Sequence, residues 1–138
     1  METIVRILEE AGMLEPGFHI HIDNPPWMPL SIEDIQQNGP NGMPTLSVAH
    51  YGEQNGDLMR DPEMLFEMRR AGSALELLAY YWRNDYLGIE QHSSYRDEGG
   101  RLIVHPAMKQ QHQTLASMWD RNLRSQGFLE AFQPSRNR

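Results

Sequence analysis

Residues 46–68 read LSVAHYGEQNGDLMRDPEMLFEM, and this stretch decides the fold. Asn55-Gly56 lies near its centre and indicates a two-residue hairpin, because a type I′ turn needs positive φ at both central positions. Before the turn, Leu46, Val48 and His50 recur at every second position, which is the period of a strand. The segments before and after the turn should therefore pair as antiparallel strands.

Pro62 interrupts the second strand of this hairpin. Proline has no N–H group to donate to a ladder, so the segment is an edge strand, contains a bulge, or divides into two pieces at Asp61-Pro62. Alternation resumes at Met64, Phe66 and Met68. We therefore expect strand structure to continue beyond the interruption.

Residues on the N-terminal side of the hairpin predict a helix and then strands. Residues 2–11 repeat apolar side chains at helical spacing, and Gly12 follows them. Phe18, Ile20 and Ile22 then alternate with polar residues, which is typical of a strand with one apolar face. Turn-forming residues separate the remaining predicted strands, which cover residues 28–35, 75–82, 86–95 and 102–104.

A long helix should run from Pro106 to about Gln126. Proline favours the first helical position, and Gly127 is a natural helix end. The side chains that we expect in its buried stripe are Met108, Leu115, Met118, Trp119 and Leu123. His112 falls on the same stripe, so we interpret it as a satisfied core or interface histidine.

This order of elements predicts an α+β fold. We expect an antiparallel meander sheet of five to six strands, with an N-terminal helix and a long C-terminal helix packed on one face. A chain of 138 residues can bury the core of one domain. We place a single α+β domain at residues 1–132 and a disordered C-terminal tail at residues 133–138.

Composition narrows the class of protein. The chain has no cysteine, no apolar run of membrane-spanning length and no N-terminal signal pattern, so we expect a cytoplasmic protein without membrane attachment. The net charge is -7: residues 1–100 hold 17 acidic and 6 basic side chains, whereas residues 101–138 hold 2 and 6. An acidic body repels phosphate backbones, so nucleic acid is not expected as a partner.

His19 and His21 form the first candidate site. Alternate residues of a strand point the same way, so two imidazoles could share one divalent metal ion. The apolar residues of this strand occupy its other face. A third ligand would be needed, and His50 is the obvious candidate. His50 alternates with Leu46 and Val48, however, which places it on an apolar face of its strand. We therefore predict no cofactor and keep a divalent metal at His19 and His21 as the alternative.

Four carboxylates surround the Asn55-Gly56 turn and form the second candidate site. They are Glu53, Asp57, Asp61 and Glu63. With His50 close in sequence, Asp57 or Asp61 could take part in acid–base chemistry or bind a cation. Carboxylates are also common in solvated turns, because aspartate side chains accept hydrogen bonds from the backbone.

Aromatic residues form the third candidate site. Trp27 stands in a proline-rich turn, and residues 80–86 read YYWRNDY. Strand alternation places Tyr80 and Trp82 on one face and Tyr81 on the other. Aromatic and arginine side chains contribute most per residue at interfaces. Our candidate binding residues are therefore Trp27, Glu63, Tyr80, Trp82, Arg83 and Asp85.

Four motifs resemble the core of a family of small conserved hypothetical proteins. They are PPWMPL at residues 25–30, SVAHY at 47–51, NGDLM at 55–59 followed by DPEM at 61–64, and RNDYLG at 83–88. The resemblance covers roughly residues 18–95. It implies an origin in bacteria, plasmids or phages, and it implies no catalytic residue because that family has no known function.

Two functions remain open at this point. The favoured one is a small non-enzymatic binding or interaction module, acting through the exposed sheet face and the 50–64 hairpin edge. We expect such a module to be a homodimer and to bind a protein or small-molecule ligand. The alternative is a small hydrolase or lyase that uses His50 with Asp57 or Asp61, with a metal held by His19 and His21.

Overall fold

The computed structural model describes residues 1–12 and 14–133. The elements in these ranges are α1 (Glu2–Ala11), β1 (His19–Asn24), β2 (Trp27–Asn38), β3 (Pro44–Gln54), β4 (Asp57–Ala71), β5 (Ala74–Asn84), β6 (Ile89–His92), β7 (Ser94–Arg96), β8 (Leu102–Val104), α2 (Pro106–Ser125) and α3 (Phe128–Ala131). Apart from Gln133, the predicted disordered tail lies outside the described residues.

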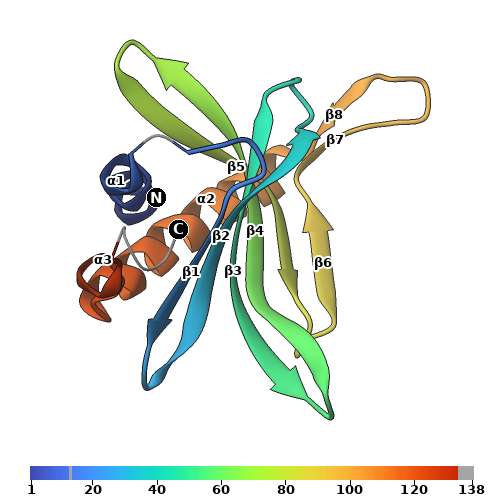
Figure 1. Ribbon diagram of the computed structural model, residues 1–138. Helices are drawn as coiled ribbons and strands as arrows, with labels where there is room; N and C mark the ends of the chain where they lie inside the picture. The colour runs from blue at the N-terminus through green and yellow to red at the C-terminus, as the bar shows by residue number, and fades with distance from the viewer. Residues whose placement is uncertain (13, 134–138) are drawn as a thin grey trace.

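Strands β1 to β6 form one sheet in which every strand pairs antiparallel with its neighbour in sequence (Figure 1). The hairpin between β3 and β4 turns at Asn55 and Gly56, both with positive φ, as the sequence predicts. The predicted α+β meander is therefore confirmed. A separate two-stranded sheet, β7 with β8, follows it.

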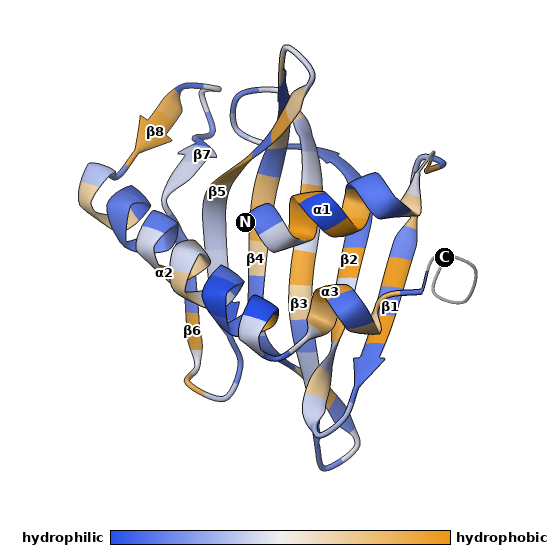
Figure 2. Ribbon diagram, turned by 90° about the vertical axis from the view of Figure 1, so that its left-hand side faces the viewer, coloured by the Kyte–Doolittle hydropathy of each residue, from blue (hydrophilic) through white to orange (hydrophobic). Residues whose placement is uncertain are grey.

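One face of the sheet is apolar because its register aligns the alternating hydrophobic residues. Ile20 lies opposite Ile32, which lies opposite Val48, and the row continues through Met64 to Trp82. Apart from Trp82, which is half-buried, these side chains are at most 1% exposed. The three helices cover this face (Figure 2), and together they form the core.

The terminal helices follow the predicted pattern closely. α1 spans residues 2–11 as expected, and Gly12 ends it with φ of 79°. α2 ends just before Gln126, and Gly127 has φ of 80°. One part of the predicted stripe was wrong: Met118 is 48% exposed, whereas Ala116 is buried.

The short helix α3 was absent from the sequence prediction. Its first residue, Phe128, is fully buried, and Phe132 just beyond it is 4% exposed. Both belong to the core under the sheet. The chain therefore remains in the core beyond the long helix, as far as Phe132.

Three irregularities alter the predicted strands. The register shifts between Leu65 and Phe66, opposite Tyr80, so Tyr80 and Trp82 do not share a face and that prediction was wrong. The predicted strand 86–95 was also wrong, because it divides at Ser93 into β6 and β7 of different sheets. At Asp61-Pro62 the strand continues through a register shift, which confirms the bulge among the predicted alternatives.

His112 joins α2 to the junction between β6 and β7. The buried His112 Nδ1 lies 2.9 Å from Ser93 Oγ, and Nε2 lies 3.1 Å from Gln91 Oε1. Burial lowers the pKa of His112. It is a satisfied core histidine, as predicted.

Among the described helices, none combines the length and apolar character needed to span a bilayer.

Candidate binding site on the open sheet face

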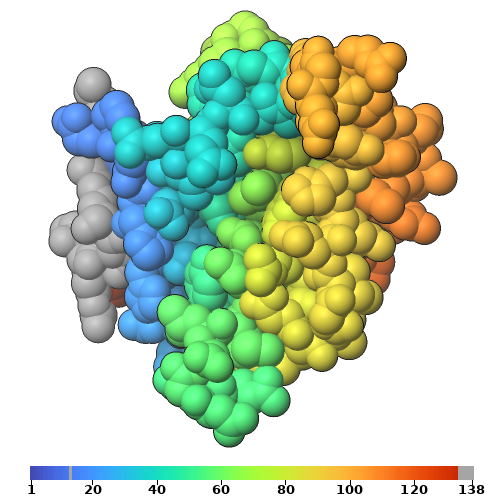
Figure 3. All heavy atoms as spheres, turned by 90° about the vertical axis from the view of Figure 1, so that its right-hand side faces the viewer, coloured from blue at the N-terminus to red at the C-terminus, as the bar shows by residue number. Residues whose placement is uncertain are grey.

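The second face of the sheet carries rows of polar side chains and lies opposite the helices. One row runs across all six strands through the residues His21, Ser31, Ala49, Glu63, Arg83 and Glu90. A neighbouring row contains His19, Glu33, Ser47, Leu65, Tyr81 and His92. Figure 3 looks onto this surface, which we call the open face. Because paired residues in an antiparallel sheet point the same way, each row is a continuous surface.

A pocket of about 550 Å³ lies on the β1–β4 part of the open face. Its size falls within the range of about 300–1,000 Å³ that is typical of small-molecule sites. The residues that line this open-face pocket are His19, His21, Pro29, Ser31, Glu33, Tyr51, Leu58 and Arg60. The pocket is thus surrounded by two imidazoles, two hydroxyls, a carboxylate, a guanidinium and two apolar side chains.

An ion-pair network connects Arg60 of the pocket to strands β5 and β6. Arg60 Nε lies 3.2 Å from Glu63 Oε1, without hydrogen-bond alignment, and Arg60 Nη1 lies 3.6 Å from Asp85 Oδ2. Arg83 Nε donates to Asp85 Oδ1 at 2.7 Å, and Arg83 Nη1 lies 3.6 Å from Glu90 Oε2. The hydroxyl of Tyr81 donates a hydrogen bond to the Glu90 carboxylate. The network holds both guanidinium groups against carboxylates.

These contacts shift the acidity of the groups involved. The backbone N–H of Arg60, followed by the Arg83 guanidinium, lowers the pKa of Asp85. The hydroxyl of Tyr81 lowers the pKa of Glu90. Burial, followed by the hydrogen bond to Glu90, raises the pKa of Tyr81 to about 12. At neutral pH the carboxylates are therefore charged and the phenol is neutral.

Both histidines of the predicted metal site line the open-face pocket. His19 and His21 are exposed, and His21 Nε2 lies 2.9 Å from Asp23 Oδ1. Within residues 1–12 and 14–133, no three histidine, aspartate or glutamate residues are grouped so that they could hold a metal ion. The pair therefore contributes to a pocket wall in this structure, and a metal at these positions stays a prediction.

His50 lies on the helix-covered face, as its parity indicated. It is 7% exposed, and its ring packs against those of Trp119 and Phe128, with centroids 5.5 and 5.4 Å away. His50 Nδ1 donates to the carbonyl oxygens of Met28 at 3.1 Å and Pro29 at 3.3 Å. Burial lowers the pKa of His50 in spite of these bonds. The fold thus separates His50 from His19 and His21 by the thickness of the sheet.

The hairpin carboxylates have different environments. Asp57 is exposed beside the turn, whereas Asp61 accepts a hydrogen bond from Asn84 Nδ2 at 2.7 Å. Glu63 accepts one from Ser47 Oγ at 2.7 Å and faces Arg60. Asp61 and Glu63 therefore stabilise strand contacts, and Asp57 contacts solvent.

The aromatic candidates are also distributed over several environments. Trp27 is 47% exposed at the turn between β1 and β2, whereas Trp82 packs against the core beneath the helices. Tyr80 lies on the open face, where its hydroxyl is 2.9 Å from Thr45 Oγ1. Arg83 and Asp85 belong to the network described above. The fold does not assemble these residues into one aromatic surface.

Sequence reasoning missed most of the pocket. The polar pocket residues that were not candidates are Ser31, Glu33, Tyr51 and Arg60. They lie on the same face as His19 and His21, which were predicted as metal ligands. Alternation along β2 could have placed Ser31 and Glu33 on the same face as the two histidines, once β2 is paired with β1. Leu58 and Arg60 lie beyond the bulge at Pro62, where alternation counted from Met64 is shifted. Tyr51 keeps the alternation of Ala49 along β3, so it too could have been placed on this face.

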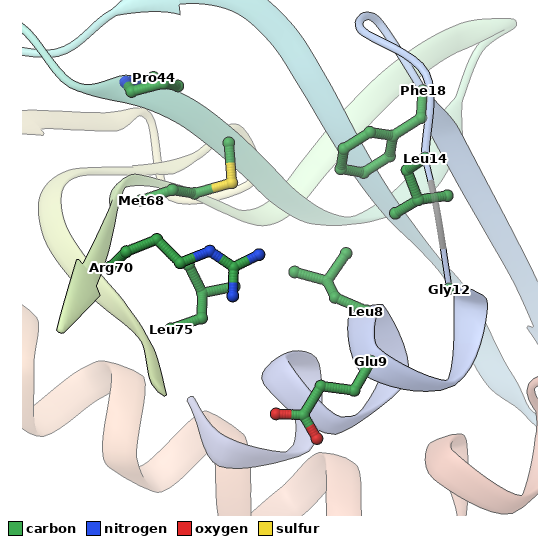
Figure 4. A pocket seen from close by; sticks show the side chains of 9 residues that line it. All are labelled: Leu8, Glu9, Gly12, Leu14, Phe18, Pro44, Met68, Arg70 and Leu75. Atoms are coloured by element: carbon green, nitrogen blue, oxygen red, sulfur yellow. The ribbon is translucent and has the colours of Figure 1, made fainter. Parts of the chain in front are cut away.

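A second hollow, of about 620 Å³, lies between α1 and the hairpin of β4 and β5 (Figure 4). Its walls are mainly apolar side chains such as Leu8, Phe18 and Leu75, and the Arg70 side chain reaches across it. Position 13, between two of its lining residues, lies outside the described chain. This hollow contains none of the predicted site residues, so the polar open-face pocket is the stronger candidate site.

The fold and this pocket define an α+β protein whose helices cover one face of a meander sheet and leave a polar pocket on the other. A family model described as "Domain of unknown function (DUF6908)" matches residues 2–129. The chain belongs to this family, which agrees with the predicted resemblance to an uncharacterised family. The searches of curated proteins and of solved structures found no match.

Proposed function

We propose that this protein is a small binding module that holds a small polar molecule in the open-face pocket. One observation carries the proposal: the pocket of about 550 Å³ combines several hydrogen-bonding side chains with the apolar groups of Pro29 and Leu58. Such a mixture of a few placed polar groups and apolar walls is typical of ligand sites. The predicted sheet face and the 50–64 hairpin both contribute, since Tyr51, Leu58 and Arg60 belong to that hairpin.

The predicted hydrolase or lyase receives less support from the geometry. A general base must reach the proton that it removes, and His50 is buried beneath two aromatic rings with Nδ1 bonded to backbone carbonyls. Asp57 is exposed at the hairpin tip, and Asp61 is bonded to Asn84. These positions favour binding over catalysis as the function of the open face.

The homodimer stays a prediction. Trp82 lies on the helix-covered face, so a dimer through the open face would use polar rows and the 69% exposed side chain of Leu58 instead. A dimer of this kind would cover the pocket. Light scattering of the wild type and of Leu58→Ser measures this association, and a wild-type monomer at high concentration would exclude it.

Protein-observed NMR with a library of small polar compounds tests the proposed function. We expect at least one compound to bind saturably and to shift the amide signals of pocket residues, Ser31 and Tyr51 among them. His21→Ala removes part of the wall and should weaken that binding. Met118→Ser, an exposed position on α2, is the matched control and should leave it unchanged. Shifts confined to the α1 hollow, or none at all, would contradict the proposal.

A further inference from the structure

We infer that the open-face pocket selects a positively charged alkylammonium group, held between the carboxylate of Glu33 and the ring of Tyr51. This inference rests on the proposed binding function and adds the charge and class of the ligand. Its basis is the balance of charges around the pocket, the aromatic ring beside them and the apolar groups in the same wall.

Glu33 supplies the carboxylate that lines the pocket. It is half-buried on β2, and its register places it between His19 and Ser47 on the open face. Among the described residues, no side-chain hydrogen bond or ion pair involves Glu33. A half-buried carboxylate interacts more strongly with a cation than an exposed one, because the local dielectric is lower.

The guanidinium groups near the pocket are already balanced by other carboxylates. Arg60 faces Glu63 at 3.2 Å and Asp85 at 3.6 Å, and Arg83 pairs with Asp85 and Glu90. An anionic ligand at Arg60 would have to compete with Glu63 and Asp85. The carboxylate of Glu33 thus favours a cationic ligand over an anionic one.

Tyr51 supplies the second element of the site. Its ring lines the same pocket. Burial, followed by the nearby charges of Glu63 and Glu33, raises the pKa of its hydroxyl in spite of the opposing effect of Arg60. The ring is therefore neutral at physiological pH and can attract a cation to its face. Pro29 and Leu58 add apolar surface for methylene groups. An ammonium group on a short alkyl chain fits all of these groups, and it could come from a free amine or from a lysine side chain.

Three four-carbon probes of different charge test the inference by NMR titration: n-butylammonium, n-butanol and butyrate. We expect n-butylammonium to bind saturably at the pocket and at least about tenfold more tightly than n-butanol, which corresponds to one favourable charge contact. Butyrate should not bind there. Equal or tighter binding of butyrate would overturn the inference.

Variants identify the groups responsible. Glu33→Gln keeps the shape of the side chain and should weaken n-butylammonium binding about tenfold. Glu53→Gln removes an exposed carboxylate outside the pocket and should have no effect. Tyr51→Phe should retain binding, because the ring remains, and Tyr51→Leu should weaken it. Unchanged affinity in Glu33→Gln would refute the assignment.

The same measurements separate this inference from the function on which it rests. Compounds from the polar library that bind at the pocket without charge preference would retain the binding function and overturn the ammonium assignment. Absence of binding by every compound would overturn both. Cadaverine and the peptide acetyl-Gly-Lys-Gly-amide then distinguish the two sources: tighter binding of the diamine supports a free amine, and tighter binding of the peptide supports a lysine side chain.

Discussion

Two hydrogen bonds join Arg60 and Asp85, one between their backbones and one from the Arg60 backbone to the Asp85 carboxylate. The N–H of Arg60 donates to Asp85 Oδ2 at 2.7 Å, and the N–H of Asp85 donates to the carbonyl oxygen of Arg60 at 2.8 Å. The turn that follows β5 is thereby fixed to β4 at the point where the bulge at Pro62 breaks the ladder. The position of the Arg60 side chain in the pocket depends on this reciprocal contact.

Asp85→Asn should destabilise the protein by about 1–3 kcal/mol at pH 7, because a charged acceptor is lost. The lowered pKa of Asp85 means that its stabilising effect is present above the ordinary carboxyl pKa and is lost as the pH falls through the folded-state value. Urea unfolding at pH 7, 5 and 3 should thus show the two proteins converging only below about pH 4. Glu53→Gln, an exposed control, should match the wild type, and an equal loss in both variants would refute this role of Asp85.

Two buried histidines should make stability depend on pH near neutrality. Burial lowers the pKa values of His50 and His112 in the folded state, so the unfolded chain binds more protons below about pH 6.5. Stability is therefore complete above that pH and declines as the pH falls, by up to about 1.4 kcal/mol per pH unit for each histidine. Urea unfolding at pH 7.5 and 5.5 measures the slope. The double variant His50→Gln/His112→Gln should have a smaller slope, and an unchanged slope would show that these two histidines do not cause the effect.

Gly39 should not tolerate alanine. A Cβ atom there would lie 2.2 Å from Glu67 Cγ, and the buried Glu67 cannot move because its carboxylate accepts hydrogen bonds from Asn41 and Met43. We expect Gly39→Ala to cost about 1–3 kcal/mol in chemical unfolding. Gly99→Ala is the matched control, since its nearest atom would be 3.5 Å away. Similar unfolding midpoints for both variants would contradict the steric argument.

Local patterns predicted most of the fold, because they depend on neighbours in sequence. The helical spacing of residues 2–11, the Asn55-Gly56 turn and the Gly127 helix end all appear in the structure. The parity of His50 with Val48 also placed it correctly on the apolar face. Such features follow from the backbone preferences of a few adjacent residues.

The candidate site was less predictable, because it depends on register. The shift at Tyr80 reverses the parity of β5, and the bulge at Pro62 does the same in β4. Pairing of β4 with the turn after β5 brings Arg60 to Asp85 across 25 positions of sequence. Neither spacing nor composition indicates that contact, so the network and the positions of Leu58 and Arg60 in the pocket wall become visible only in three dimensions.

Phe128 tests whether the unpredicted helix α3 stabilises the fold. Its ring is fully buried against His50, with the ring centroids 5.4 Å apart, and belongs to the main core. Phe128→Ala should leave a cavity and reduce the free energy of unfolding by about 3–5 kcal/mol, whereas Met118→Ala on the exposed side of α2 should change it by less than about 0.5 kcal/mol. Thermal and urea unfolding of both variants measure the difference. A loss below about 1 kcal/mol for Phe128→Ala would show that α3 detaches from the sheet in solution, and His50 would then lose one of the two rings that bury it.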